Sequence, residues 1–141
     1  MAYDGFMSAL VLILVIVLSF VALTHGLWGI GYWFPLRDEK DLVKAVVGVK
    51  GATRMPGAIP CALVAASLIV TIFALLSDPT VISNGILALA AVVFLVRGLL
   101  SWVPVWRRAA PQEPFATYDR RLYGPVSFMI GVAIGAVLYL Q

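Results

Sequence analysis

The sequence predicts an all-α integral membrane protein, an up-down four-helix bundle that forms a single transmembrane domain over residues 1–141. Hydrophobic residues make up 62% of the chain and charged residues 12%, about half the charged share of an average soluble domain. The apolar residues also gather in four charge-free stretches, each long enough for the ~20 helical residues that cross a bilayer. A water-soluble protein of this size cannot bury that much apolar surface.

The first span is predicted at about residues 6–33, where no charged residue occurs. It differs from a secretory signal peptide because it lacks a basic leader and a small-residue cleavage site. The connector at residues 34–55 mixes charged residues with Leu42, Val43 and Val46. This spacing allows a short helix that lies on the membrane surface.

The remaining spans are predicted at about residues 56–76, 79–102 and 120–140. The turn between the second and third spans is so short that these two helices must be antiparallel neighbours. Asp78 in this turn is a good N-cap for the third span, and Pro104 ends that span or bends it. A loop over residues 103–119 then leads into the fourth span.

The positive charges are distributed unevenly along the chain. Five of the ten Lys and Arg residues lie between positions 37 and 54, and four lie between positions 107 and 121. Because positively charged loops stay in the cytoplasm, both of these loops are expected there and both chain termini are expected on the outer side. The basic loops are expected to contact anionic lipid head groups, and no nucleic-acid partner is expected.

Small residues at four-residue spacing allow helices to approach closely in lipid. The fourth span carries such a stripe at Ser127, Gly131 and Gly135, and the first span carries a shorter one at Ala22 and Gly26. The stripes predict helix packing within the bundle or, as an alternative, the face of a homodimer.

Two ionisable side chains, His25 and Arg97, lie within the predicted spans. Such groups are costly in hydrocarbon unless they are paired or hydrated. Both lie within ~12 Å of the cytoplasmic ends of their helices, at ~1.5 Å per residue. The polar and aromatic residues at similar depth are Trp28, Tyr32, Ser101 and Tyr123. Together these residues can line a pocket for a quinone or phospholipid head group, or they can be purely architectural, since Arg and aromatic residues favour membrane interfaces.

Several kinds of site are excluded. One His and one Cys cannot supply the three or four ligands of a zinc site, so no metal is expected. A membrane cytochrome usually needs two axial ligands, and no phosphate-binding loop or nucleophile elbow occurs, so no cofactor is expected. The spans contain no carboxylate, which argues against proton-coupled export.

Three short motifs carry a family resemblance. They are His25-x-x-Trp28-x-x-Gly31, the run Phe94-Leu95-Val96-Arg97-Gly98, and the set Phe115, Asp119, Tyr123 and Pro125. In this order they resemble the motifs of a bacterial membrane family, domain of unknown function 3995. The resemblance implies a four-helix protein of the bacterial inner membrane with no assigned activity. In that membrane the outer side, where the charge distribution puts both termini, is the periplasm. It also marks Asp119, a carboxylate that can pair with Arg97 or with the basic loops.

Three functions are compatible with these residues. The first is a non-catalytic accessory or lipid- or quinone-binding component, alone or as a subunit of a larger membrane complex. The second is an enzyme that acts on a lipid or quinone, with His25 as the acid–base group and Arg97 holding an anionic oxygen. The third is a small transporter that works as an oligomer.

Overall fold

The computed structural model describes residues 2–141, and side chains from residue 5 onward. Every regular element in this part of the chain is helical, and four segments are long and apolar enough to cross a membrane. The spans are α1 (Ala2–Gly29), α3 (Ala58–Leu76), α4 (Val81–Leu100) and a composite of α6 (Phe115–Tyr118), η1 (Asp119–Tyr123) and α7 (Gly124–Leu140). The connecting helices are α2 (Glu39–Val46) and α5 (Pro104–Ala109).

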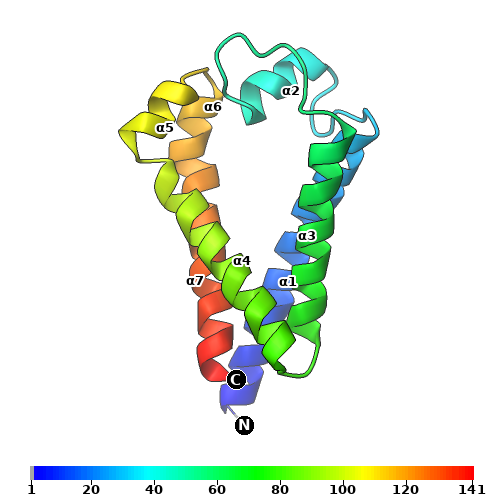
Figure 1. The fold of residues 1–141 in the computed structure, drawn as a ribbon, viewed down its shortest axis with the longest axis vertical. Helices are drawn as coiled ribbons and strands as arrows, with labels where there is room; N and C mark the ends of the chain where they lie inside the picture. The colour runs from blue at the N-terminus through cyan, green and yellow to red at the C-terminus, as the bar shows by residue number, and fades with distance from the viewer. Residues whose placement is uncertain (1) are drawn as a thin grey trace.

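The four spans alternate in direction and form two pairs, α1 with α3 and α4 with α7 (Figure 1). The pairs meet at the end that holds both termini and the α3–α4 turn, and they diverge toward the end that holds α2 and α5. The shared core lies in the narrow part and contains Leu14, Leu18, Leu87 and Ile134. We call the two pairs the α1–α3 arm and the α4–α7 arm.

Most of the apolar surface of the spans faces outward. Between 17% and 33% of the most apolar window of each span is buried inside the protein. Exposing the remainder to water would be unfavourable by ~25 cal/mol per Å², whereas acyl chains solvate it readily. The burial pattern therefore agrees with a membrane environment for all four spans.

The α4–α7 arm is held together by direct backbone contact. A Cβ atom added at Gly98 would lie 2.7 Å from the backbone nitrogen of Phe128, and one at Gly131 would lie 2.8 Å from that of Leu95. Such distances leave no room for a side chain, so α4 and α7 pack as small-residue helices do in lipid. Ser127 is half-buried on the same helix. Ala22 of the stripe on the first span is buried in the core. The two remaining glycines of the expected stripes, Gly26 and Gly135, have nothing within 4 Å of an added Cβ.

Three helix boundaries differ from those expected from hydropathy. The first span ends at Gly29 and not near residue 33, because Gly31 has a φ of 82° that turns the chain. The third span is capped by Thr80, whose side chain accepts a hydrogen bond from Ser83 N, and not by Asp78. The fourth span begins at residue 115 and not near residue 120, and in its first turn Glu113 accepts a hydrogen bond from Thr117 N.

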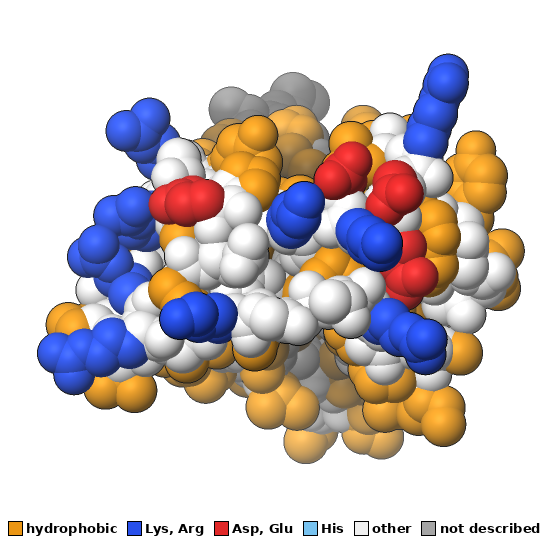
Figure 2. Space-filling view, turned by 90° about the horizontal axis from the view of Figure 1, so that it is seen from above, with side chains coloured by type: hydrophobic (Ala, Val, Ile, Leu, Met, Phe, Trp, Pro, Cys, Tyr) orange, Lys and Arg blue, Asp and Glu red, His pale blue; other side chains and the backbone are white. Residues whose placement is uncertain are grey.

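The wide end of the molecule carries all ten Lys and Arg residues, which lie at positions 37–54 and 97–121. Figure 2 shows their side chains spread over this face, with acidic side chains gathered mainly on one side of it. Here α2 begins after Asp38, which caps it by accepting from Lys40 N at 2.7 Å. Leu42 and Val43 of α2 are buried against the end of the α1–α3 arm.

Candidate functional site

A buried ion pair lies at the wide end of the α4–α7 arm. Asp119 stands in η1, the wide helical turn that precedes α7, and its side chain is 4% exposed. Arg97 Nη2 on α4 donates a hydrogen bond to Asp119 Oδ1. Trp106 Nε1 on α5 donates to the other carboxylate oxygen at 2.9 Å, and the Arg97 guanidinium lies 5.5 Å from the centre of the Trp106 ring. One cation on α4 and one neutral N–H donor on α5 thus satisfy the two oxygens of a buried carboxylate.

Close packing between α4 and the start of α7 brings this pair together. Ser101 is fully buried and donates to Gly98 O at 2.8 Å. A Cβ at Gly124 would lie 2.1 Å from Ser101 Oγ, so only glycine at this position allows the two chain segments to approach so closely. Arg97 Nη1 is buried as well, and no hydrogen-bond partner for it occurs among the described residues.

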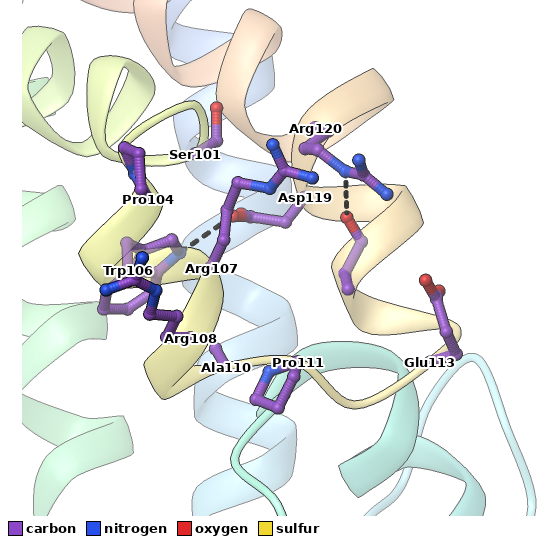
Figure 3. Close-up of a pocket in the computed structure, with 11 residues that line it drawn as sticks. Ser101, Pro104, Trp106, Arg107, Arg108, Ala110, Pro111, Glu113, Asp119 and Arg120 are labelled. Atoms are coloured by element: carbon purple, nitrogen blue, oxygen red, sulfur yellow. Dashed lines mark hydrogen bonds between the residues drawn. The ribbon is translucent and has the colours of Figure 1, made fainter.

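An open pocket of about 390 Å³ lies beside the ion pair, between the end of α4, α5 and α6–η1 (Figure 3). Its charged lining residues are Arg107, Arg108, Glu113, Asp119 and Arg120. We call it the arginine pocket. Asp119 is already paired with Arg97, so the unpaired charge of the arginine pocket comes from the guanidinium groups of Arg107, Arg108 and Arg120 and from Glu113. Arg120 uses its Nε to donate to Ala116 O at 3.0 Å, which leaves its terminal nitrogens available.

A second open pocket, of about 250 Å³, lies at the wide end of the α1–α3 arm. We call it the histidine pocket; its lining includes His25, Trp28, Met55, Pro60, Cys61 and Val64. His25 Nδ1 lies 2.8 Å from Val21 O on its own helix, and its ring lies 4.8 Å from the Trp28 ring. The Trp28 indole nitrogen donates to Phe34 O at 2.7 Å.

The two tyrosines expected near these groups have different surroundings. Tyr32 follows the end of α1 and is 59% exposed. Tyr123 donates its hydroxyl to Ala45 O of α2 at 3.1 Å, and Gln112 N donates to Gly48 O nearby at 3.0 Å. Tyr123 therefore connects the two arms across the wide end and lines neither pocket.

The structure brings some of the expected site residues together and separates others. Arg97, Ser101 and Asp119 share the α4–α7 arm, and His25 and Trp28 share the α1–α3 arm. His25 and Arg97 are not brought together, because their helices pair with different partners and the arms diverge at this level (Figure 1). The two pockets have no lining residue in common.

Trp106 and the arginines at 107, 108 and 120 line the arginine pocket, although no sequence pattern singled them out. A tryptophan next to two arginines at the end of a span is the expected composition of any membrane interface. The closest signal is the position of Trp106 two residues after Pro104, which starts a short helix. That helix turns the indole back toward α4.

A scan of the chain against protein families matches residues 18–134 to the family described as "Protein of unknown function (DUF3995)". Searches of the curated proteins and of the solved structures gave no match. The matched region contains both pockets and the ion pair, and the four membrane-length helices of the chain fit a family of membrane proteins. The chain is therefore a multi-pass membrane protein that belongs to the DUF3995 family.

Proposed function

We propose that this protein is a non-catalytic component of the bacterial inner membrane that binds the head group of an anionic phospholipid in the arginine pocket. In this proposal the wide end faces the cytoplasm and both termini face the periplasm. The observation that carries the proposal is a pocket with three guanidinium groups at the end of the spans, next to a carboxylate that is already neutralised.

The charge distribution supports the orientation. All ten Lys and Arg residues belong to the wide end, and positively charged segments near spans are retained on the cytoplasmic side. At that level the anionic head groups of the inner leaflet lie within contact distance, and each nearby Lys or Arg contributes about 1 kcal/mol of attraction to them.

The shape and chemistry of the pocket support a phosphate ligand. A guanidinium group donates two parallel hydrogen bonds that match the oxygens of a phosphate. The side chains of Arg107 and Arg108 have no carboxylate partner among the described side chains. A volume of about 390 Å³ is within the range of small-molecule sites, ~300–1,000 Å³.

The separation of the two pockets favours binding over catalysis. A general acid or base must lie within ~2.6–3.2 Å of the proton that it transfers, or act through one water. His25 lines the histidine pocket, on the other arm from the arginines. A head group held by the arginines therefore has no histidine beside it to act as an acid–base group.

Lipid binding can be tested by native mass spectrometry of protein purified in mild detergent and titrated with phosphatidylglycerol or phosphatidylcholine. Arg120→Gln and Arg121→Gln form a matched pair, because the arginines are neighbours and only Arg120 lines the pocket. A charged hydrogen bond contributes ~1.5–3 kcal/mol, so Arg120→Gln should weaken phosphatidylglycerol binding at least tenfold. Arg121→Gln should change it less than threefold. Equal losses in both variants would mean that only general charge attraction operates.

The orientation is tested independently by labelling a single introduced cysteine. In a Cys61→Ala background, one new cysteine is placed at Ser77, in the turn of the narrow end, or at Lys50, in the wide end. A membrane-impermeant maleimide applied to spheroplasts should label the Ser77→Cys protein, and should label the Lys50→Cys protein only after lysis. The reverse pattern would contradict the orientation.

A further inference from the structure

The hydrogen bond between His25 and its own helix fixes which ring nitrogen carries the proton. Val21 O lies 2.8 Å from His25 Nδ1, and a backbone carbonyl oxygen can only accept. Nδ1 must therefore donate, so the neutral imidazole carries its hydrogen on Nδ1 and a lone pair on Nε2. Because Nδ1 faces the α1 backbone, Nε2 lies on the opposite edge of the ring, away from that backbone.

This nitrogen is the strongest hydrogen-bond acceptor among the side chains that line a largely apolar pocket, because the sulfur atoms of Met55 and Cys61 accept only weakly. The other polar ring that lines the histidine pocket, Trp28, already donates its N–H to Phe34 O at 2.7 Å. The remaining lining side chains belong to Val, Met, Pro and Cys residues. A ligand that fills this pocket thus meets apolar walls, one aromatic face and a single strong acceptor.

We propose that the histidine pocket binds a ring-headed lipid through a phenolic hydroxyl, as in a hydroquinone, which donates a hydrogen bond to His25 Nε2. The hydroxyl supplies the donor that Nε2 lacks, and the ring lies against the Trp28 face and the apolar wall. This site is separate from the arginine pocket and does not depend on the function proposed for it.

The size and the opening of the pocket fit such a head group. An apolar cavity of ~150 Å³ holds one benzene ring, so a pocket of about 250 Å³ has room for one substituted ring and excludes a whole lipid. Pro60 and Val64 line the pocket and are exposed on α3. A tail can therefore leave the pocket past these residues into the surrounding acyl chains.

The same arrangement should favour the reduced form of the ligand, a hydroquinone, over the oxidised form, a quinone. A quinone carries carbonyl oxygens, which only accept, and these would face the Nε2 lone pair without a hydrogen between them. One hydrogen bond contributes about a factor of ten in affinity. We therefore expect the hydroquinone to bind about tenfold more tightly than the matched quinone, and about tenfold more tightly than its dimethyl ether, which keeps the ring and loses both donors.

The test uses the fact that His25 is the only histidine of the chain. Protein labelled with ¹⁵N-histidine, in detergent micelles and mildly alkaline buffer, gives two ring-nitrogen resonances from this one residue. The probe is a hydroquinone with a ten-carbon alkyl tail, kept reduced by dithionite under argon. Addition of this probe should move the Nε2 resonance, and the dimethyl ether should leave it in place.

Three variants separate this contact from general partitioning into the micelle. His25→Phe keeps a ring beside Trp28 and removes both the acceptor and the labelled reporter, so its dissociation constant is measured by isothermal titration calorimetry and should rise about tenfold. Val64→Trp fills the mouth of the pocket and should abolish the shift of the Nε2 resonance. Val70→Trp makes the same change on α3 at an exposed residue outside the pocket lining, and it should bind as the parent does. Circular dichroism checks that each variant is folded.

Four results would overturn the proposal. These are a hydrogen on Nε2 in the unliganded protein, equal affinity for the hydroquinone and its dimethyl ether, unchanged affinity in His25→Phe, and no shift of the Nε2 resonance with any probe.

Discussion

Removing Arg97 should lower the free energy of unfolding more than removing Asp119, because the two partners of this ion pair differ in exposure. The Asp119 side chain is 4% exposed and that of Arg97 is 32% exposed. Arg97→Met leaves a fully buried carboxylate whose remaining donor is Trp106 Nε1. Leaving one charge of a buried pair unpaired costs ~3–5 kcal/mol, so we expect Arg97→Met to lower the free energy of unfolding by about 3 kcal/mol.

Asp119→Asn should cost less, although it breaks the same ion pair. An asparagine oxygen can still accept from Trp106, and the Arg97 side chain, which is 32% exposed as a whole, can turn its guanidinium toward the interface. We expect a loss of about 1–2 kcal/mol. The double variant removes both charges, so it should be more stable than Arg97→Met alone, with a favourable coupling energy within the usual ~0.5–3 kcal/mol.

These free energies can be measured by titrating the protein in mixed micelles with sodium dodecyl sulfate and following helix content by circular dichroism. Arg121→Met serves as the control, because this arginine is exposed and unpaired among the described side chains; its effect should stay within ~0.5 kcal/mol. The reasoning fails if Asp119→Asn destabilises as much as Arg97→Met, or if the double variant is less stable than Arg97→Met.

Four other variants test the packing of the arms and their connection. Gly98→Ala should lower the free energy of unfolding by ~1–3 kcal/mol because α4 and α7 must move apart, whereas Gly26→Ala, with open space around it, should be neutral or stabilising in the same titration. Tyr123→Phe removes the hydrogen bond to Ala45 O and should cost ~0.5–1.5 kcal/mol, with faster amide exchange in α2; unchanged exchange would contradict a bridging role. Gly48→Ala should also speed exchange in α2, because φ is 71° and an added Cβ would lie 2.0 Å from a neighbouring phenylalanine ring; protection equal to the parent would argue against that contact.

Much of the fold could be predicted because the physics of the bilayer acts on long windows. Charge-free runs of about 20 residues have few alternatives to a spanning helix. Helix ends are set by single hydrogen bonds, which hydropathy does not register. The apolar run continues to residue 33, yet α1 stops at Gly29, and the chain folds back so that Trp28 donates to Phe34 O.

The candidate site could be predicted less well because depth along a helix does not determine its neighbours. His25 and Arg97 have similar depth, and both sit at the wide end. Which helices pair depends on close contacts such as those of Gly98 and Gly131 with the facing backbone. These contacts join α4 to α7, and they place Arg97 beside Asp119 on a different arm from His25. Spacing along one helix carries no information of this kind.

The divergence of the two arms gives the molecule a wedge-shaped outline, broad where the basic residues lie and slender where the chain begins and ends (Figure 1). A body of this outline displaces unequal areas from the two monolayers of a membrane. Many copies inserted in the same direction would give a flat sheet a spontaneous bend, and the broad ends would lie on its convex side.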